Sequence, residues 1–98
     1  MTRSEVITAV AAQEAELRRL GATSVSLFGS VARGTERYGS DVDMFIDYNR
    51  ASSFNAFDLL RIRDLLQTAF GVRVDVTTRD ALHPRLRAAI ETSAVRVF

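Results

Sequence analysis

One stretch, residues 27–47, constrains the fold of this 98-residue chain more than any other. It reads LFGSVARGTERYGSDVDMFID: a short apolar run, a turn at Gly29 and Ser30, a polar segment, and an ending in which acidic and apolar residues alternate. Alternation with a period of two is typical of a β-strand, whose successive side chains project to opposite faces. Asp41 and Asp43 therefore project side by side from the face opposite the apolar one.

These paired acids and the turn before them predict a site for a metal and a nucleotide. Two neighbouring carboxylates repel each other unless a cation lies between them, and Mg²⁺ is commonly held by one or two carboxylates together with nucleotide phosphates. Gly29 and Gly34 allow the backbone to approach a ligand closely. Backbone N–H groups and the Ser30 hydroxyl can then bind phosphate oxygens.

The segment after the turn adds one more candidate. Residues 31–33 are predicted to begin a short helix, whose N-terminus would place a partial positive charge beside a bound phosphate. The Arg33 guanidinium can contact phosphate, although a solvated surface arginine is the alternative. The predicted nucleotide-binding residues are therefore Gly29, Ser30, Arg33 and Gly34.

The spacing of the two halves carries a family resemblance. Gly29-Ser30, then ten residues, then Asp41-x-Asp43 resembles the signature of the DNA polymerase beta-like nucleotidyltransferases, and the short chain is similar to their minimal form, the MNT domain. Val31 departs from the pattern, because a larger or polar residue is expected there. The resemblance implies an α/β (α+β) fold, with a small mixed twisted sheet, helices packed mainly on one face, and one domain spanning residues 1–98.

A third acid is expected on a later strand. Residues 72–77 alternate again, so that Asp75 projects from the face opposite the valines and can join Asp43 if the two strands are neighbours. Asp47 also has the correct parity, but it lies about 13 Å from Asp43 along an extended strand, too far to share a metal. The resemblance likewise has its third acid on a later strand. The predicted catalytic and metal-binding residues are Asp41, Asp43 and Asp75.

Composition excludes several other chemistries. The chain has no cysteine, which removes disulfides, thiolate zinc sites and thiol nucleophiles. It also has no lysine, which removes a P-loop lysine, a Schiff base and a lysine–nucleotide intermediate. Nucleotidyl transfer would then be direct and metal-assisted. The expected cofactors are two Mg²⁺ ions about 3.5 to 4 Å apart, with ATP as the substrate.

Charge and hydropathy bear on the location and on the partners. The formal net charge is +1 and the arginines are scattered, which argues against a general nucleic-acid binder. No apolar run is long enough to cross a bilayer, and the N-terminus has no signal-peptide pattern. We therefore expect a cytoplasmic protein with no membrane contact.

The remaining elements are read from periodicity and from turn residues. A capping box at residues 2–5 begins a helix that ends at Gly21. A strand over 23–28, a polar loop over 35–40, a helix over 54–70 ending at Gly71, and an edge strand over 95–98 are predicted. Pro84 marks the start of another helix, whose apolar face would consist of Leu82, Leu86, Ala89 and Ile90.

The acceptor of the transferred group is not identifiable from this chain, because 98 residues leave no room for a substrate domain. The MNT resemblance implies a partner, typically a HEPN-family ribonuclease toxin, in a hetero-oligomer where the MNT protein is the antitoxin and transfers AMP from ATP to a toxin tyrosine. Two alternatives stay open: an antitoxin that acts by binding only, and a small-molecule nucleotidyltransferase. The intact acids and the Gly29-Ser30 turn favour catalysis.

Overall fold

A four-stranded mixed sheet forms the centre of the computed structural model, which describes residues 1–37 and 41–98. The strand order is β3-β2-β1-β4, with β1 at Ala22–Phe28, β2 at Val42–Tyr48, β3 at Val74–Thr78 and β4 at Val95–Arg96. Strand β2 runs antiparallel to β1 and parallel to β3, and β4 pairs antiparallel with β1 at the edge. The predicted α/β fold and its final edge strand are confirmed.

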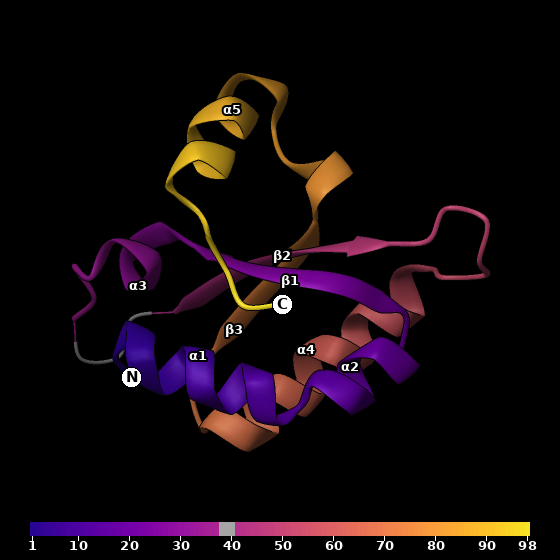
Figure 1. Cartoon of the computed structure of the whole chain (residues 1–98), viewed down its shortest axis with the longest axis horizontal. Helices are drawn as coiled ribbons and strands as arrows, with labels where there is room; N and C mark the ends of the chain where they lie inside the picture. The colour runs from indigo at the N-terminus through magenta and orange to yellow at the C-terminus, as the bar shows by residue number, and fades with distance from the viewer. Residues whose placement is uncertain (38–40) are drawn as a thin grey trace.

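Three helices cover one face of this sheet: α1 (Arg3–Ala12), α2 (Glu14–Arg19) and α4 (Ala56–Phe70) (Figure 1). Alternation in the strands explains why, since Val25 and Leu27 of β1 and the apolar residues at alternate positions of β2 are buried against these helices. The fully buried residues of this layer include Val6, Val10, Leu17, Val25, Leu27, Met44, Ile46, Ile62 and Leu66. The acidic face of β2 is left on the other side.

The single N-terminal helix that the sequence predicts is two helices in the structure. The capping box is present, because Thr2 accepts a hydrogen bond from the backbone of Glu5, whose side chain bonds back to Thr2. The helix then ends at Gln13, where the backbone leaves helical geometry. The apolar stripe is interrupted at this point by polar residues, and restarting the helix there allows Leu17 to be buried.

Helix α4 is close to its predicted range, and its two ends explain its length. Asn55 caps the N-terminus by accepting hydrogen bonds from the next turn, and Asp58 completes a capping box. Gly71 ends the helix in a left-handed conformation with φ of 68°, which confirms the predicted stop.

Helix α5 (Pro84–Ser93) lies on the acidic side of the sheet, where it contacts β1 and α3, and the short α3 (Gly29–Arg33) lies at the edge of the sheet (Figure 1). Pro84 begins α5 as predicted, but the predicted burial of its apolar residues is wrong, because Leu86 is 56% exposed and Ala89 is also exposed. Only Leu82, before the helix, is buried. The ion pair from Glu91 to Arg79 connects α5 to the segment that follows β3, whereas the pair between Glu91 and Arg87 lies within the helix.

The polar loop predicted at 35–40 is described as far as residue 37, and the rest of it lies outside the described residues. Within the described parts of the chain, every helix is too short or too polar to span a bilayer.

Candidate active site

Asp43 and Asp75 are direct neighbours across the β2–β3 pair. The parallel register places Asp43 opposite Asp75, and the antiparallel register with β1 places Phe28 on its other side. Because directly opposed residues of one sheet face have close Cβ atoms, the two carboxylates share one patch of the acidic face. The predicted strand pairing, on which the choice of Asp75 over Asp47 depended, is therefore confirmed; the role of Asp75 as a metal ligand stays a prediction.

The electrostatics at Asp43 oppose its ionisation. Partial burial raises the pKa of Asp43, and the nearby charges of Asp75 and Asp41 raise this pKa further. The positive charge of Arg33 partly offsets these effects. In residues 1–37 and 41–98, neither Asp43 nor Asp75 has a hydrogen bond or an ion pair. A carboxylate that is repelled by two others, and whose repulsion Arg33 offsets only in part, is suited to bind a cation.

Gly29 has a specific steric reason to be glycine. Its φ is +75°, in the left-handed region that side chains rarely adopt. A Cβ atom at this position would lie 2.4 Å from Oδ2 of Asp43 and 3.2 Å from its Cγ. The glycine therefore brings the turn after β1 into direct contact with the carboxylate, and the two halves of the sequence motif meet in space.

The other predicted nucleotide-binding residues surround this contact. Ser30 follows in α3, half-buried, and among the described residues its hydroxyl has no hydrogen-bond partner. Arg33 is exposed in the last turn of α3, near enough to affect the pKa of Asp43. Gly34 ends α3 with φ of 72°, and a Cβ atom there would meet nothing within 4 Å. The glycine at 34 is thus explained by the helix end and not by a close approach.

Asp41 lies just before β2, and its carboxylate forms an ion pair with Arg73. Its Oδ2 is 3.8 Å from Nε of Arg73, an exposed ion pair that contributes little to stability. In the described part of the chain, no three acidic, histidine or cysteine side chains converge into a ready metal-binding group. Hard oxygen donors are nevertheless what Mg²⁺ takes, so the donor set fits a divalent metal once Asp41 leaves Arg73.

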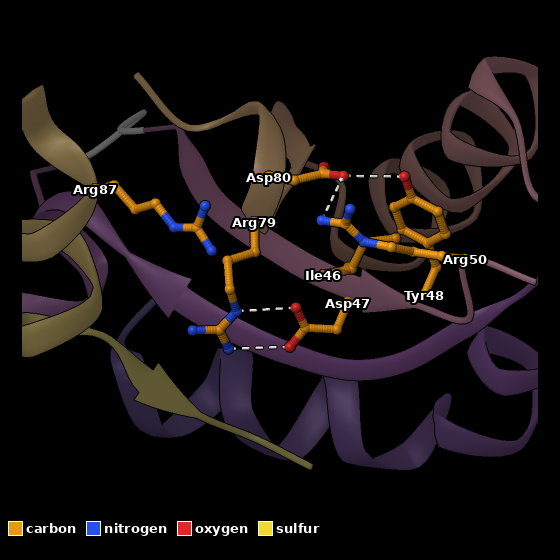
Figure 2. A pocket seen from close by; sticks show the side chains of 7 residues that line it. All are labelled: Ile46, Asp47, Tyr48, Arg50, Arg79, Asp80 and Arg87. Atoms are coloured by element: carbon orange, nitrogen blue, oxygen red, sulfur yellow. Dashed lines mark hydrogen bonds and ion pairs between the residues drawn. The ribbon is translucent and has the colours of Figure 1, made fainter. Parts of the chain in front are cut away.

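Asp47, the acid that the sequence interpretation set aside, forms a structural ion pair (Figure 2). Its two carboxylate oxygens accept hydrogen bonds from Nε and Nη2 of Arg79 at 2.9 and 3.0 Å, and Oδ2 also accepts one from Ser24 at 2.6 Å. The Arg79 guanidinium lies over the Phe45 ring, 4.8 Å from its centroid. These hydrogen bonds, above all those from Arg79, lower the pKa of Asp47 although burial opposes them.

This ion pair makes stability depend on pH. Because the pKa of Asp47 is lower in the folded state, its ionised form stabilises the fold above the unfolded pKa of about 3.9, and that contribution is lost as pH falls through the folded pKa. We expect Asp47→Asn to reduce the free energy of unfolding more at pH 7 than at pH 3, measured by urea unfolding. An equal reduction at both pH values would contradict this account.

Periodicity alone missed several residues of the acidic face. Phe45 shares the parity of Asp43, so alternation would expose it, yet it is buried beneath Arg79 and lies 5.9 Å from the Phe28 ring. The parity of Arg73 places it on the same face as Asp75, but alternation does not indicate its ion pair with Asp41. For Arg87 a signal was available, because Arg87 and Glu91 have the i, i+4 spacing of a helical ion pair.

The comparisons with known proteins agree with this fold and arrangement. The chain belongs to the nucleotidyltransferase domain family, whose model matches residues 11–97. Protein adenylyltransferase MntA of Thermococcus cleftensis is 29% identical over 98 residues, covering 99% of this chain and 97% of the relative. MJ0435 of Methanocaldococcus jannaschii, provisionally named a protein adenylyltransferase, is 35% identical over 82 residues, covering 84% of this chain and 86% of the relative.

Solved structures extend the likeness. One provisionally described as a minimal nucleotidyltransferase matches with a TM-score of 0.82 and 33% identity, covering 97% of this chain and 95% of that chain. A toxin–antitoxin with AMP-PNP matches with a TM-score of 0.71 and 20% identity, covering 90% of this chain and 72% of that chain. A complex of the tri-AMPylated Shewanella oneidensis HEPN toxin with MNT antitoxin matches with a TM-score of 0.63 and 16% identity, covering 90% of this chain and 68% of that chain. At such low identity, the last two likenesses show the fold alone.

Proposed function

We propose that this chain transfers AMP from ATP to a tyrosine hydroxyl of a partner protein, a HEPN-family ribonuclease toxin, and thereby acts as its antitoxin. The observation that carries the proposal is the contact between the Gly29 turn and Asp43, with Asp75 directly opposite on β3. This contact joins a phosphate-binding turn to a pair of acids. The relatives named protein adenylyltransferase, and the fold shared with toxin–antitoxin complexes, support the partner and the reaction.

In this proposal the chain's own residues bind and orient the nucleotide. The backbone at Gly29, free of a Cβ atom, and the Ser30 hydroxyl hold the triphosphate, so that the α-phosphorus faces the acceptor hydroxyl in line. Arg33, at the end of α3, offsets negative charge beside Asp43 and can contact a phosphate oxygen. Gly34 ends α3, so that the chain can turn away from the nucleotide.

The Mg²⁺ ions would be held by Asp41, Asp43 and Asp75. When bound, these ions would activate the acceptor hydroxyl and neutralise the negative charge of the departing pyrophosphate. The negative charges of Asp75 and Asp41 help to raise the pKa of Asp43. A bound cation would relieve this repulsion, because the same negative charges attract a metal ion. Asp41 must first break its contact with Arg73, and that exposed pair is weak.

The proposal is tested with a purified HEPN-family protein as the acceptor. Incubation with ATP and Mg²⁺ is expected to add one or more adenylyl groups to the partner, detected by intact-mass spectrometry and located on tyrosine by peptide fragmentation. A partner whose mass never changes, while its toxicity is still suppressed by an Asp41→Asn/Asp43→Asn variant, would instead establish an antitoxin that acts by binding only. Modification of a small molecule and not of the partner would support the other alternative.

A metal titration tests the third acid separately. Asp75→Asn is expected to weaken Mn²⁺ binding, measured by electron paramagnetic resonance, because it removes one of the two carboxylates that face each other across β2 and β3. Asp47→Asn is the matched control, since Asp47 lies on the same face but is neutralised by Arg79. Loss of Mn²⁺ binding in the Asp47 variant alone would exclude Asp75 as the third ligand.

A further inference from the structure

A second feature of the acidic face is a cavity of about 180 Å³ between the end of β2, the short helix η1 (Arg79–Ala81) and α5. Figure 2 shows it from close by, with charged side chains converging from these three elements. The lining residues are Ile46, Asp47, Tyr48, Arg50, Arg79, Asp80 and Arg87. Asp43 lies about 13 Å away along β2, because it is four positions before Asp47 on an extended strand. The cavity is therefore distinct from the proposed nucleotide site.

Part of the charge in this cavity is already neutralised. Arg79 binds Asp47 with two nitrogens and Glu91 with the third, at 3.0 Å, so that all three of its nitrogens are engaged. Asp80 accepts hydrogen bonds from Thr78 and from Tyr48, and the hydrogen bond from Thr78 is the larger cause of the lowered pKa of Asp80. Arg79, Asp47 and Asp80 are therefore already paired by ion pairs or hydrogen bonds within the cavity.

The two other arginines of the cavity, Arg87 and Arg50, have N–H groups that form no hydrogen bond with the described residues. Arg87 bonds Glu91 through Nε only, at 2.7 Å, and its two terminal nitrogens have no partner in residues 1–37 or 41–98. Figure 2 shows its guanidinium extending toward the space above Arg79. Arg50 has a single long contact, 3.4 Å from Asp80, and its side chain is 77% exposed. The unsatisfied groups of the cavity are thus guanidinium donors, which favour an anion and above all a carboxylate or phosphate.

We propose that this cavity is a docking pocket for an acidic side chain of the acceptor protein; this inference rests on the proposed function. A volume of about 180 Å³ accommodates one side chain and is too small for a nucleotide. The phosphates of ATP have their own proposed site at the Gly29 turn, and a neutral base gains little from guanidinium donors. The acceptor protein should therefore carry an Asp or Glu about 13 Å from its acceptor tyrosine hydroxyl, matching the separation of the pocket from Asp43.

The test removes the guanidinium groups of Arg50 and Arg87 and measures the affinity for the partner protein. In an Arg50→Gln/Arg87→Gln variant, the Kd for the HEPN-family partner protein, measured by calorimetry, is expected to rise about tenfold or more. In transfer assays, the rise should occur in KM for the acceptor protein and not in KM for ATP. Arg61→Gln/Arg63→Gln is the matched control, because it also removes two positive charges, from ion-paired arginines on α4, which lies on the opposite face.

Three outcomes decide the matter. If the Arg50→Gln/Arg87→Gln variant binds the partner with the same Kd as the control variant on α4, the docking pocket is excluded. A rise in KM for ATP also overturns it, because the occupant would then be the nucleotide. If the wild-type protein binds the partner without ever changing its mass, the proposed catalytic function fails, yet loss of binding in the double variant would still support the pocket. Circular dichroism confirms that both variants are folded.

Discussion

Asp43→Asn is expected to slow AMP transfer about a hundredfold or more, which corresponds to about 3 kcal/mol in the activation free energy. The substitution removes a charged ligand from the predicted metal site while keeping the size of the side chain. The same change should not weaken the fold, and the free energy of unfolding of the metal-free protein should stay level or increase. Transfer rates and urea unfolding on the same preparations measure both effects.

The sign of the stability effect follows from the raised pKa of Asp43. A carboxyl whose pKa is higher in the folded state opposes folding once it ionises, so wild-type stability falls as pH rises from the unfolded pKa through the folded one. An asparagine carries no charge and avoids that loss. Catalytic sites commonly trade stability for activity in this way.

A surface acid provides the control for Asp43→Asn. Asp64 lies on α4, its side chain is 66% exposed, and its nearest charged partner is Arg63. Asp64→Asn also removes one negative charge, but it should leave both transfer and stability nearly unchanged. Full transfer activity in the Asp43 variant would exclude the metal assignment, whereas equal losses in both variants would point to a general effect of charge.

The parts of the fold that periodicity predicted are those where burial alone determines the pattern. Alternation in β2 and β3 correctly separates a buried valine and methionine face from an acidic face. The strand pairing that brings Asp75 to Asp43 followed from the same parity. Helix ends at Gly71 and Pro84 were predictable because each residue has a backbone property that interrupts or begins a helix.

The parts that were missed depend on contacts between distant residues. Nothing local to Asp47 indicates that Arg79, 32 positions later, will neutralise it. The burial of Phe45 on an otherwise polar face depends on Arg79 as well. Likewise, Leu86 is exposed although the amphipathic pattern predicts its burial, and that pattern gives no sign of the ion pair that joins Glu91 of α5 to Arg79. Side-chain pairing across elements is therefore the information that periodicity lacks.

Gly29→Ala is expected to reduce transfer about a hundredfold, because the added Cβ atom would lie 2.4 Å from Oδ2 of Asp43 and would displace that carboxylate. A misplacement of about 1 Å at a reacting centre can cost this much. Rotating the Asp43 side chain would relieve the contact with Oδ2 only by moving the carboxylate away from its position opposite Asp75, and the Cβ atom of Asp43 would still lie 3.3 Å from the new methyl group. Kd for a non-hydrolysable ATP analogue should rise in parallel.

Gly71 supplies the control that separates this contact from backbone strain. Its φ of 68° is close to the 75° of Gly29, but a Cβ atom at Gly71 would meet nothing within 4 Å. Both alanine variants should lose about 1 kcal/mol of stability from the left-handed conformation, measured by urea unfolding, while only the Gly29 variant should lose transfer. If Gly71→Ala impairs transfer equally, the loss arises from destabilisation, and the approach of Gly29 to Asp43 has no catalytic role.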